Sequence, residues 1–215
     1  MHCKRTVLML GLIAAASLPA PDACAEAVPR FEITPFVGYR AGGNFEADAT
    51  DTTPKKSVDV REDGSFGLDL GLYRDEHGFY EFLYSQQTAA LDSNDPQLSG
   101  LDVKIEYYQF GGTAMFPGET DWLVPYLSMT IGATRWSADG FDSDTKFSGS
   151  LGGGLRIPFS DYLVATLGLR GYLTFVQSNT SFFCVSDAEG GGCLVKSSGS
   201  TFFQAEAQLG LTLRF

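Results

Sequence analysis

Residues Thr201–Phe215 read TFFQAEAQLGLTLRF, and this stretch decides the fold class. Apolar side chains occupy every second position in it, and mostly polar or small side chains occupy the positions between them. A period of two is the pattern of a β-strand with one apolar and one polar face. The stretch is longer than an average strand of about 5–6 residues, and it reaches the roughly 9–11 residues that a tilted strand needs to cross a bilayer.

The same alternation recurs along the chain, with hardly any helical periodicity. We expect eight strands in all. They lie at approximately Arg30–Arg40, Asp63–Arg74, Phe79–Gln87, Leu101–Phe116, Val124–Ala138, Lys146–Ile157, Tyr162–Gln177 and Thr201–Phe215.

The connections between these segments differ in length. Those after the second, fourth and sixth segments are short, and those after the first, third and seventh are long; the long ones are Ala41–Glu62, Thr88–Gly100 and Ser178–Ser200. The connection after the fifth segment, Asp139–Thr145, is an exception, because it is short where a long loop is expected. A soluble sandwich would also alternate, but short turns at one end and long loops at the other are typical of an outer-membrane barrel. The sequence therefore predicts an all-β protein, a closed antiparallel eight-stranded transmembrane β-barrel with an up-and-down meander.

Aromatic residues gather near both ends of the predicted strands, where interfacial girdles are expected. Those near the short turns include Phe31, Tyr73, Trp122, Tyr126 and Phe215, and those near the long loops include Tyr39, Trp136, Phe147, Phe175 and Phe203.

Composition excludes several other classes of protein. The 215 residues carry 15 basic and 26 acidic side chains, a formal net charge of −11. Such acidity argues against nucleic-acid binding, which requires a basic surface. Only one stretch is strongly apolar, which excludes a bundle of membrane-spanning helices. The 25 glycines disfavour helices and suit tight turns.

The first 25 residues are typical of an export signal. Lys4 and Arg5 provide the positive start, and Val7–Ala16 is an apolar run too short to anchor the chain in a bilayer. Ala23–Ala25 offers a cleavage site, with a lipoprotein cut before Cys24 as the alternative. The expected organisation is a signal peptide over 1–25 and one barrel domain over 26–215.

Two cysteines, Cys184 and Cys193, remain after removal of the signal. In an oxidising compartment we expect them to form a disulfide that closes a small loop. A metal site is not expected, because no histidine or further cysteine lies near them in the sequence.

The chain resembles the small eight-stranded outer-membrane β-barrels of Gram-negative bacteria, a group that includes the OmpA transmembrane domain, OmpX and OmpW. The resemblance covers nearly all of Arg30–Phe215, and its most specific element is the last strand with its terminal Phe215. The opening Ile33–Tyr39 is similar to the first strand of such barrels but is a weak motif by itself. The resemblance implies that Phe215 is a C-terminal assembly signal read by the barrel assembly machinery.

Charged residues in phase with the polar face should point into the lumen. The expected set is Glu32, Asp69, Glu81, Lys104, Glu106, Arg156, Arg170, Glu206 and Arg214. Because isolated buried charges are costly, these acids and bases should pair and fill the barrel. The alternative is a narrow polar passage, for which lumenal glycines would leave room.

No residue set indicates catalysis, a metal or a cofactor. The only histidine of the mature chain, His77, lies in a predicted periplasmic turn, so a catalytic triad would lack its usual base. Arg135 falls on the lipid-facing phase of its strand, where it can snorkel or contact a lipopolysaccharide phosphate; a slipped register is the alternative.

These observations predict a non-enzymatic integral protein of the bacterial outer membrane, with both termini periplasmic. We expect a role in envelope integrity or in surface interaction through the extracellular loops. The alternative is a narrow channel or an OmpW-like passage for small, including hydrophobic, molecules. The expected partners are outer-membrane lipids, lipopolysaccharide and the barrel assembly machinery. We expect no nucleic-acid partner, and we expect the protein to be a monomer.

Overall fold

The computed structural model describes residues 30–47, 56–93, 99–118, 122–176, 180–185, 192–197 and 201–215. The predicted signal peptide lies outside these residues. Within them, no helix is long and apolar enough to cross a membrane.

Eight long strands form the wall of a closed antiparallel barrel. They are β1 (Phe31–Gly42), β4 (Asp63–Asp75), β5 (Gly78–Ser93), β6 (Asp102–Met115), β7 (Val124–Ala138), β8 (Asp144–Pro158), β9 (Leu163–Phe175) and β12 (Thr201–Arg214). All eight predicted strands are present, and the fold class is confirmed. The largest difference is in β5, which continues to Ser93, past its expected end at Gln87.

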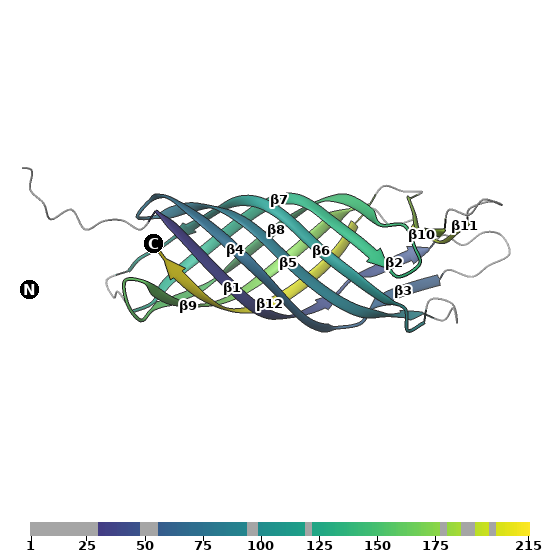
Figure 1. The fold of residues 1–215 in the computed structure, drawn as a ribbon, viewed down its shortest axis with the longest axis horizontal. Helices are drawn as coiled ribbons and strands as arrows, with labels where there is room; N and C mark the ends of the chain where they lie inside the picture. The colour runs from purple at the N-terminus through teal and green to yellow at the C-terminus, as the bar shows by residue number, and fades with distance from the viewer. Residues whose placement is uncertain are drawn as a thin grey trace, which may run out of the picture.

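The hydrogen-bond register closes the wall with a fixed offset. Each strand pairs with its neighbour in the chain order of the barrel, and β1 also pairs with β12. A path of paired residues that leaves β1 at Phe31 and crosses every strand returns to β1 at Ala41, ten residues further along. Such an offset requires the strands to tilt relative to the barrel axis, and the tilt is evident in Figure 1.

The two ends of the barrel differ, and we call them the turn end and the loop end. At the turn end, the Arg30 amide donates to the carbonyl oxygen of Phe215 at 2.7 Å, and the Phe215 amide donates to Phe31 at 2.8 Å. The start of β1 and the end of β12 therefore lie side by side at the turn end.

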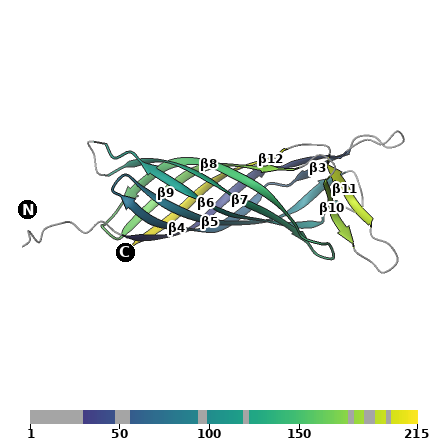
Figure 2. The same ribbon diagram turned by 90° about the horizontal axis from the view of Figure 1, so that it is seen from above.

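At the loop end, four further strands extend the sheet (Figures 1 and 2). They are β2 (Asn44–Ala47), β3 (Lys56–Val60), β10 (Thr180–Val185) and β11 (Gly192–Ser197). They fall inside two of the predicted long loops, where the sequence shows no sustained alternation.

Apolar side chains cover the outer face of the barrel, because successive side chains of a strand point to opposite faces. Exposed aromatic residues form a band at each end; they include Phe31, Phe116, Trp122, Phe159, Tyr162 and Phe215 at the turn end, and Tyr39, Phe66, Phe147, Phe175 and Phe203 at the loop end.

Three aromatic residues that we expected in these bands point inward instead. Tyr73 donates a hydrogen bond to the lumenal Glu32, Tyr126 lines a lumenal cavity, and Trp136 is only 2% exposed. Their expected positions were wrong because closeness to a strand end does not decide the face, whereas the phase of the residue within its strand does.

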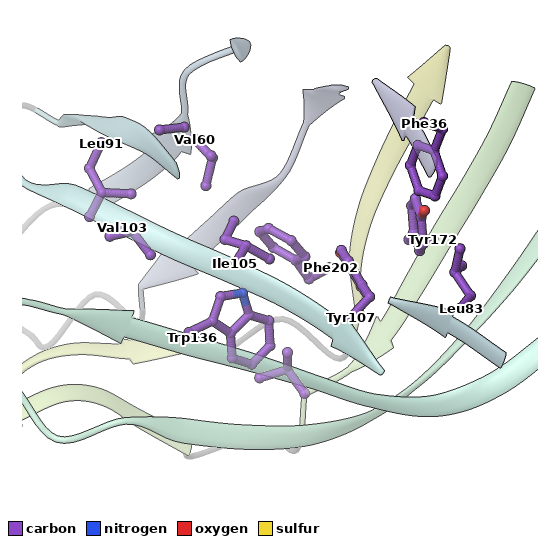
Figure 3. Packing of buried hydrophobic residues seen from close by; sticks show 12 residues of the cluster. Phe36, Val60, Leu83, Leu91, Val103, Ile105, Tyr107, Trp136, Tyr172 and Phe202 are labelled. Atoms are coloured by element: carbon purple, nitrogen blue, oxygen red, sulfur yellow. The ribbon is translucent and has the colours of Figure 1, made fainter. Parts of the chain in front are cut away.

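The inner face changes character toward the loop end, where a hydrophobic cluster fills the barrel (Figure 3). Trp136 meets Phe202 edge to face with ring centroids 5.6 Å apart, and Ile105 lies beside both rings in Figure 3. Leu91, Val103 and Ile105 are fully buried in the same cluster. The loop end of the barrel therefore has the apolar interior of a soluble protein.

Candidate functional site: the lumenal network

Three buried ion pairs follow one another along the lumen, and the first lies at the turn end. Arg156 binds Glu32 with both terminal nitrogens, at 3.0 Å and 2.6 Å. Tyr73 donates a third hydrogen bond to this carboxylate at 2.6 Å, and the Nε of Arg214 lies 3.9 Å from it. A bidentate arginine–carboxylate pair fixes both geometry and charge, so this layer is rigid.

The second ion pair joins Glu81 of β5 to Arg170 of β9. Both terminal nitrogens of Arg170 lie 3.1 Å from one oxygen of Glu81, and Thr113 donates to the other oxygen. Arg170 also donates to the hydroxyl of Ser150 at 3.1 Å. The pair spans the lumen from one wall to the other.

Between these two pairs lies a cavity of about 30 Å³. Asp69 lines it, and its Oδ1 accepts no hydrogen bond from the residues that the structure describes. The volume and the polar lining suit an ordered water molecule, which needs roughly 10–15 Å³ and two or more polar partners.

The third ion pair joins Arg40 to Glu206, 2.9 Å apart, and both side chains are fully buried. Tyr172 and Gln208 each donate to the second oxygen of Glu206 at 2.6 Å. The rings of Tyr107 and Tyr172 stack 4.1 Å apart, and the Arg40 guanidinium lies about 5 Å from each ring centroid. Arginine, carboxylate and two aromatic rings therefore close the lumen directly below the hydrophobic cluster.

The structure brings seven of the nine expected lumenal charges together. They are Glu32, Asp69, Glu81, Arg156, Arg170, Glu206 and Arg214. Sequence reasoning missed Arg40, although it shares the phase of Glu32 and Thr34 on the same strand. With Arg40 included, four acids and four arginines balance in this network.

Lys104 and Glu106 do not face the lumen, so this expectation was wrong. On β6 the inward residues are Ile105 and Tyr107, both fully buried, whereas Tyr108 on the phase of Glu106 is exposed. The physical reason is that β6 passes from the membrane level into the loop end, where the interior is apolar and charged residues belong outside.

Other expected positions can be placed as well. Arg135 lies on the outer face, and β7 pairs with both neighbours without a register shift, so the alternative of a slipped strand does not hold. His77 lies in the exposed turn after β4, where its amide donates to Asp75 at 2.9 Å. The hydrogen bond from Arg74 lowers the pKa of Asp75, which leaves this turn charged and solvated.

The expected disulfide falls where the backbone is described but the side chains are not. β10 and β11 are antiparallel, and Cys184 lies directly opposite Cys193. Opposed residues of antiparallel strands have Cα atoms roughly 4.5–5.5 Å apart, which is within the range that disulfides use. We expect both thiols to resist maleimide labelling until a reductant is added. Labelling of the untreated folded protein would contradict this.

Comparison with known proteins agrees with this architecture. A family model described as the outer membrane protein beta-barrel domain matches residues 8–215. Among solved structures, 37 chains match significantly. A search of curated proteins found no significant match.

Three solved structures illustrate the similarity. The outer membrane protein AlkL in lipid bilayers is 12% identical with a TM-score of 0.57, over 94% of this chain and 97% of AlkL. Neisserial surface protein A is 15% identical with a TM-score of 0.52, over 86% and 97% of the two chains. The N-terminal barrel domain of Pseudomonas aeruginosa OprF is 14% identical with a TM-score of 0.43, over 84% and 97%. At such identities the likeness to AlkL and Neisserial surface protein A supports the fold alone.

Proposed function

Because the chain belongs to the outer membrane protein beta-barrel family, whose members are integral to the bacterial outer membrane, we propose that it is a closed, non-enzymatic barrel. In this proposal it contributes to envelope integrity and contacts other molecules through its loops. The observation that carries the proposal is the filling of the lumen by ion pairs and, above them, by the hydrophobic cluster.

The lumenal network argues against a water-filled path. The cavity between the first two ion pairs has a volume of about 30 Å³, room for no more than a few water molecules at roughly 10–15 Å³ each. A permeating ion would have to separate buried, hydrogen-bonded ion pairs, and breaking even one such pair costs about 3–5 kcal/mol. The hydrophobic cluster beyond them fills the loop end of the barrel with mainly apolar side chains.

Three of the four carboxylates in the described network are held in ion pairs, which is consistent with a structural role for the network. Its carboxylates Glu32, Glu81 and Glu206 each accept hydrogen bonds from an arginine. His77 lies in an exposed turn, away from the lumen. A general base must instead be within reach of a substrate and poised to accept a proton.

We further propose that both chain ends lie on the periplasmic side and that the long loops lie outside. The pairing of Arg30 with Phe215 at the turn end supports this orientation, because barrels of this kind place short turns in the periplasm. Phe215, at the end of the strand that closes the barrel, would then be available to the assembly machinery. Outer-membrane lipids and lipopolysaccharide would surround the wall of a monomer.

Single-channel recording in a planar bilayer tests the closed barrel. We expect the folded protein to give no reproducible conductance steps, whereas a general porin added to the same bilayer does. Different gel mobility of boiled and unboiled samples would establish folding beforehand. Ion-selective steps whose selectivity changes in an Arg170→Gln variant would overturn the proposal and establish a narrow channel.

A further inference from the structure

A polar patch interrupts the apolar outer wall on β5, β6 and β7 near the loop end. We call it the Lys104–Arg135 patch, and it comprises Tyr84, Gln86, Lys104, Glu106, Tyr108 and Arg135. It contains two cations and one acid. The patch takes no part in the lumenal ion-pair network, and the proposed closed barrel does not explain it.

The patch lies on one side of the barrel only. A single row of paired residues runs around the wall through Val37, Phe66, Gln86, Glu106 and Arg135. Because of the register offset, the row rises toward the loop end as it crosses the strands, and its members are polar or charged from β5 to β7. On β8, β9 and β12, the loop-end band is formed by exposed phenylalanines; they are Phe147, Phe175 and Phe203. Phe147 pairs with Ala133, two residues from Arg135, so at this end of the barrel the charged residues of β6 and β7 adjoin the phenylalanines of β8, β9 and β12.

Contacts within the patch hold the acid and leave cationic groups exposed. One oxygen of Glu106 accepts hydrogen bonds from Tyr84 at 3.0 Å and Tyr108 at 3.2 Å, and it lies 2.9 Å from the Lys104 ammonium. Lys104 remains 40% exposed. Arg135 donates to the hydroxyl of Ser143 at 3.4 Å and forms no ion pair with the residues that the structure describes.

The patch also lies at the border of the apolar wall. Two residues further toward the turn end, the outward positions next to Tyr84 and Tyr108 are Phe82, Phe110 and Ile131, all of them exposed. Tyrosines are enriched at the level of lipid headgroups, where the ring can contact the hydrocarbon and the hydroxyl can reach polar groups. Arg135 and Lys104 are therefore at the height where phosphate groups of a leaflet would lie.

We propose that the Lys104–Arg135 patch binds the phosphate of a glycolipid in the outer leaflet. The patch carries a net positive charge, and an arginine fork is suited to a phosphate, which it binds through two hydrogen bonds. Lys104 adds a second donor, and Glu106 holds it in place. This inference rests on the proposed orientation, which puts the loop end on the side where the leaflet is lipopolysaccharide.

Native mass spectrometry of the folded protein in detergent tests the site. The probe is a diphosphorylated lipid A, compared with its dephosphorylated form and with phosphatidylglycerol. We expect the doubly substituted Lys104→Gln/Arg135→Gln variant to bind the diphosphorylated probe about tenfold more weakly than the unmodified chain, because it loses two charge-assisted contacts. Arg74→Gln is the matched control, since Arg74 is an exposed cation at the turn end, and it should leave binding unchanged.

Several outcomes would overturn the inference. Equal affinity of the double variant and the unmodified chain would show that the patch does not hold the phosphate. Displacement of the probe by inorganic phosphate at the same concentration would assign the site to a soluble anion. Preference for phosphatidylglycerol, lost in the double variant, would indicate that the patch faces the other leaflet, and the proposed orientation would fail with it. Conductance of the unmodified chain would overturn the closed barrel while leaving the phosphate result intact.

Discussion

Replacing Arg170 with alanine should lower the free energy of unfolding by about 3–5 kcal/mol, the cost of removing one member of a buried ion pair. Glu81 would lose both of its arginine contacts and keep only the hydrogen bond from Thr113. Nearby Asp69 offers no compensation, because it is another acid on the same cavity. Urea unfolding in lipid vesicles, followed by the loss of the compact gel form, measures the change.

A double substitution separates charge from packing. In Glu81→Met/Arg170→Met both charges are absent and most of the side-chain volume is kept, so we expect it to recover most of the stability lost in Arg170→Ala. If the double variant were as unstable as the single one, the stabilising role of Arg170 would lie in packing and in its hydrogen bond to Ser150. If Arg170→Ala were as stable as the unmodified chain, the unpaired Glu81 carboxylate would not be destabilising, and the prediction would be wrong.

Truncation of Trp136 should have an effect of similar size at the loop end. Trp136→Ala removes the largest fully buried side chain of the hydrophobic cluster, and such truncations cost about 3–5 kcal/mol. The control is Trp122→Ala, because Trp122 is the other tryptophan of the chain and is 65% exposed in the band at the turn end. We expect the control to cost much less.

Fluorescence locates the two tryptophans independently of stability. In vesicles of brominated lipid, the emission of Trp136 in a Trp122→Phe variant should be quenched only weakly, since that ring is enclosed by Phe202 and its neighbours. Trp122 in a Trp136→Phe variant should be quenched strongly. Strong quenching of Trp136 would return it to the outer band, where its position near a strand end had suggested it lies.

Alternation within a strand was enough to predict the barrel and most of its lumenal charges. In β12 and β9 the apolar and polar phases stay the same over the whole membrane level, so Glu206 and Arg170 could be assigned to the lumen from the sequence. Arg40 followed the same rule and was missed because it stands at the edge of its predicted strand. The ion-pair partners could not be predicted, because they join strands that are far apart in sequence.

The failures share one physical cause. Lys104, Glu106 and Trp136 lie where the wall leaves the membrane level and the preference for each face reverses: apolar residues turn inward and charged residues outward. A strand that crosses this boundary keeps its period of two. Its inward-facing positions, however, change from polar to apolar, and its outward-facing positions change from apolar to polar or charged. In the structure, β5 extends to Ser93, six residues past its predicted end, which indicates that the wall continues beyond the membrane.

The ten-residue offset of the closed register has a consequence for how such a protein can change. Strand number and offset are integers, and together they set the tilt and the width of the tube. No gradual shift of the backbone can widen the bore. Permeability can therefore evolve only through the side chains that occupy the bore, by exchanges such as arginine for glycine, while the exterior that lipids meet stays the same. The backbone geometry of the barrel and its permeability can therefore change independently of each other during evolution.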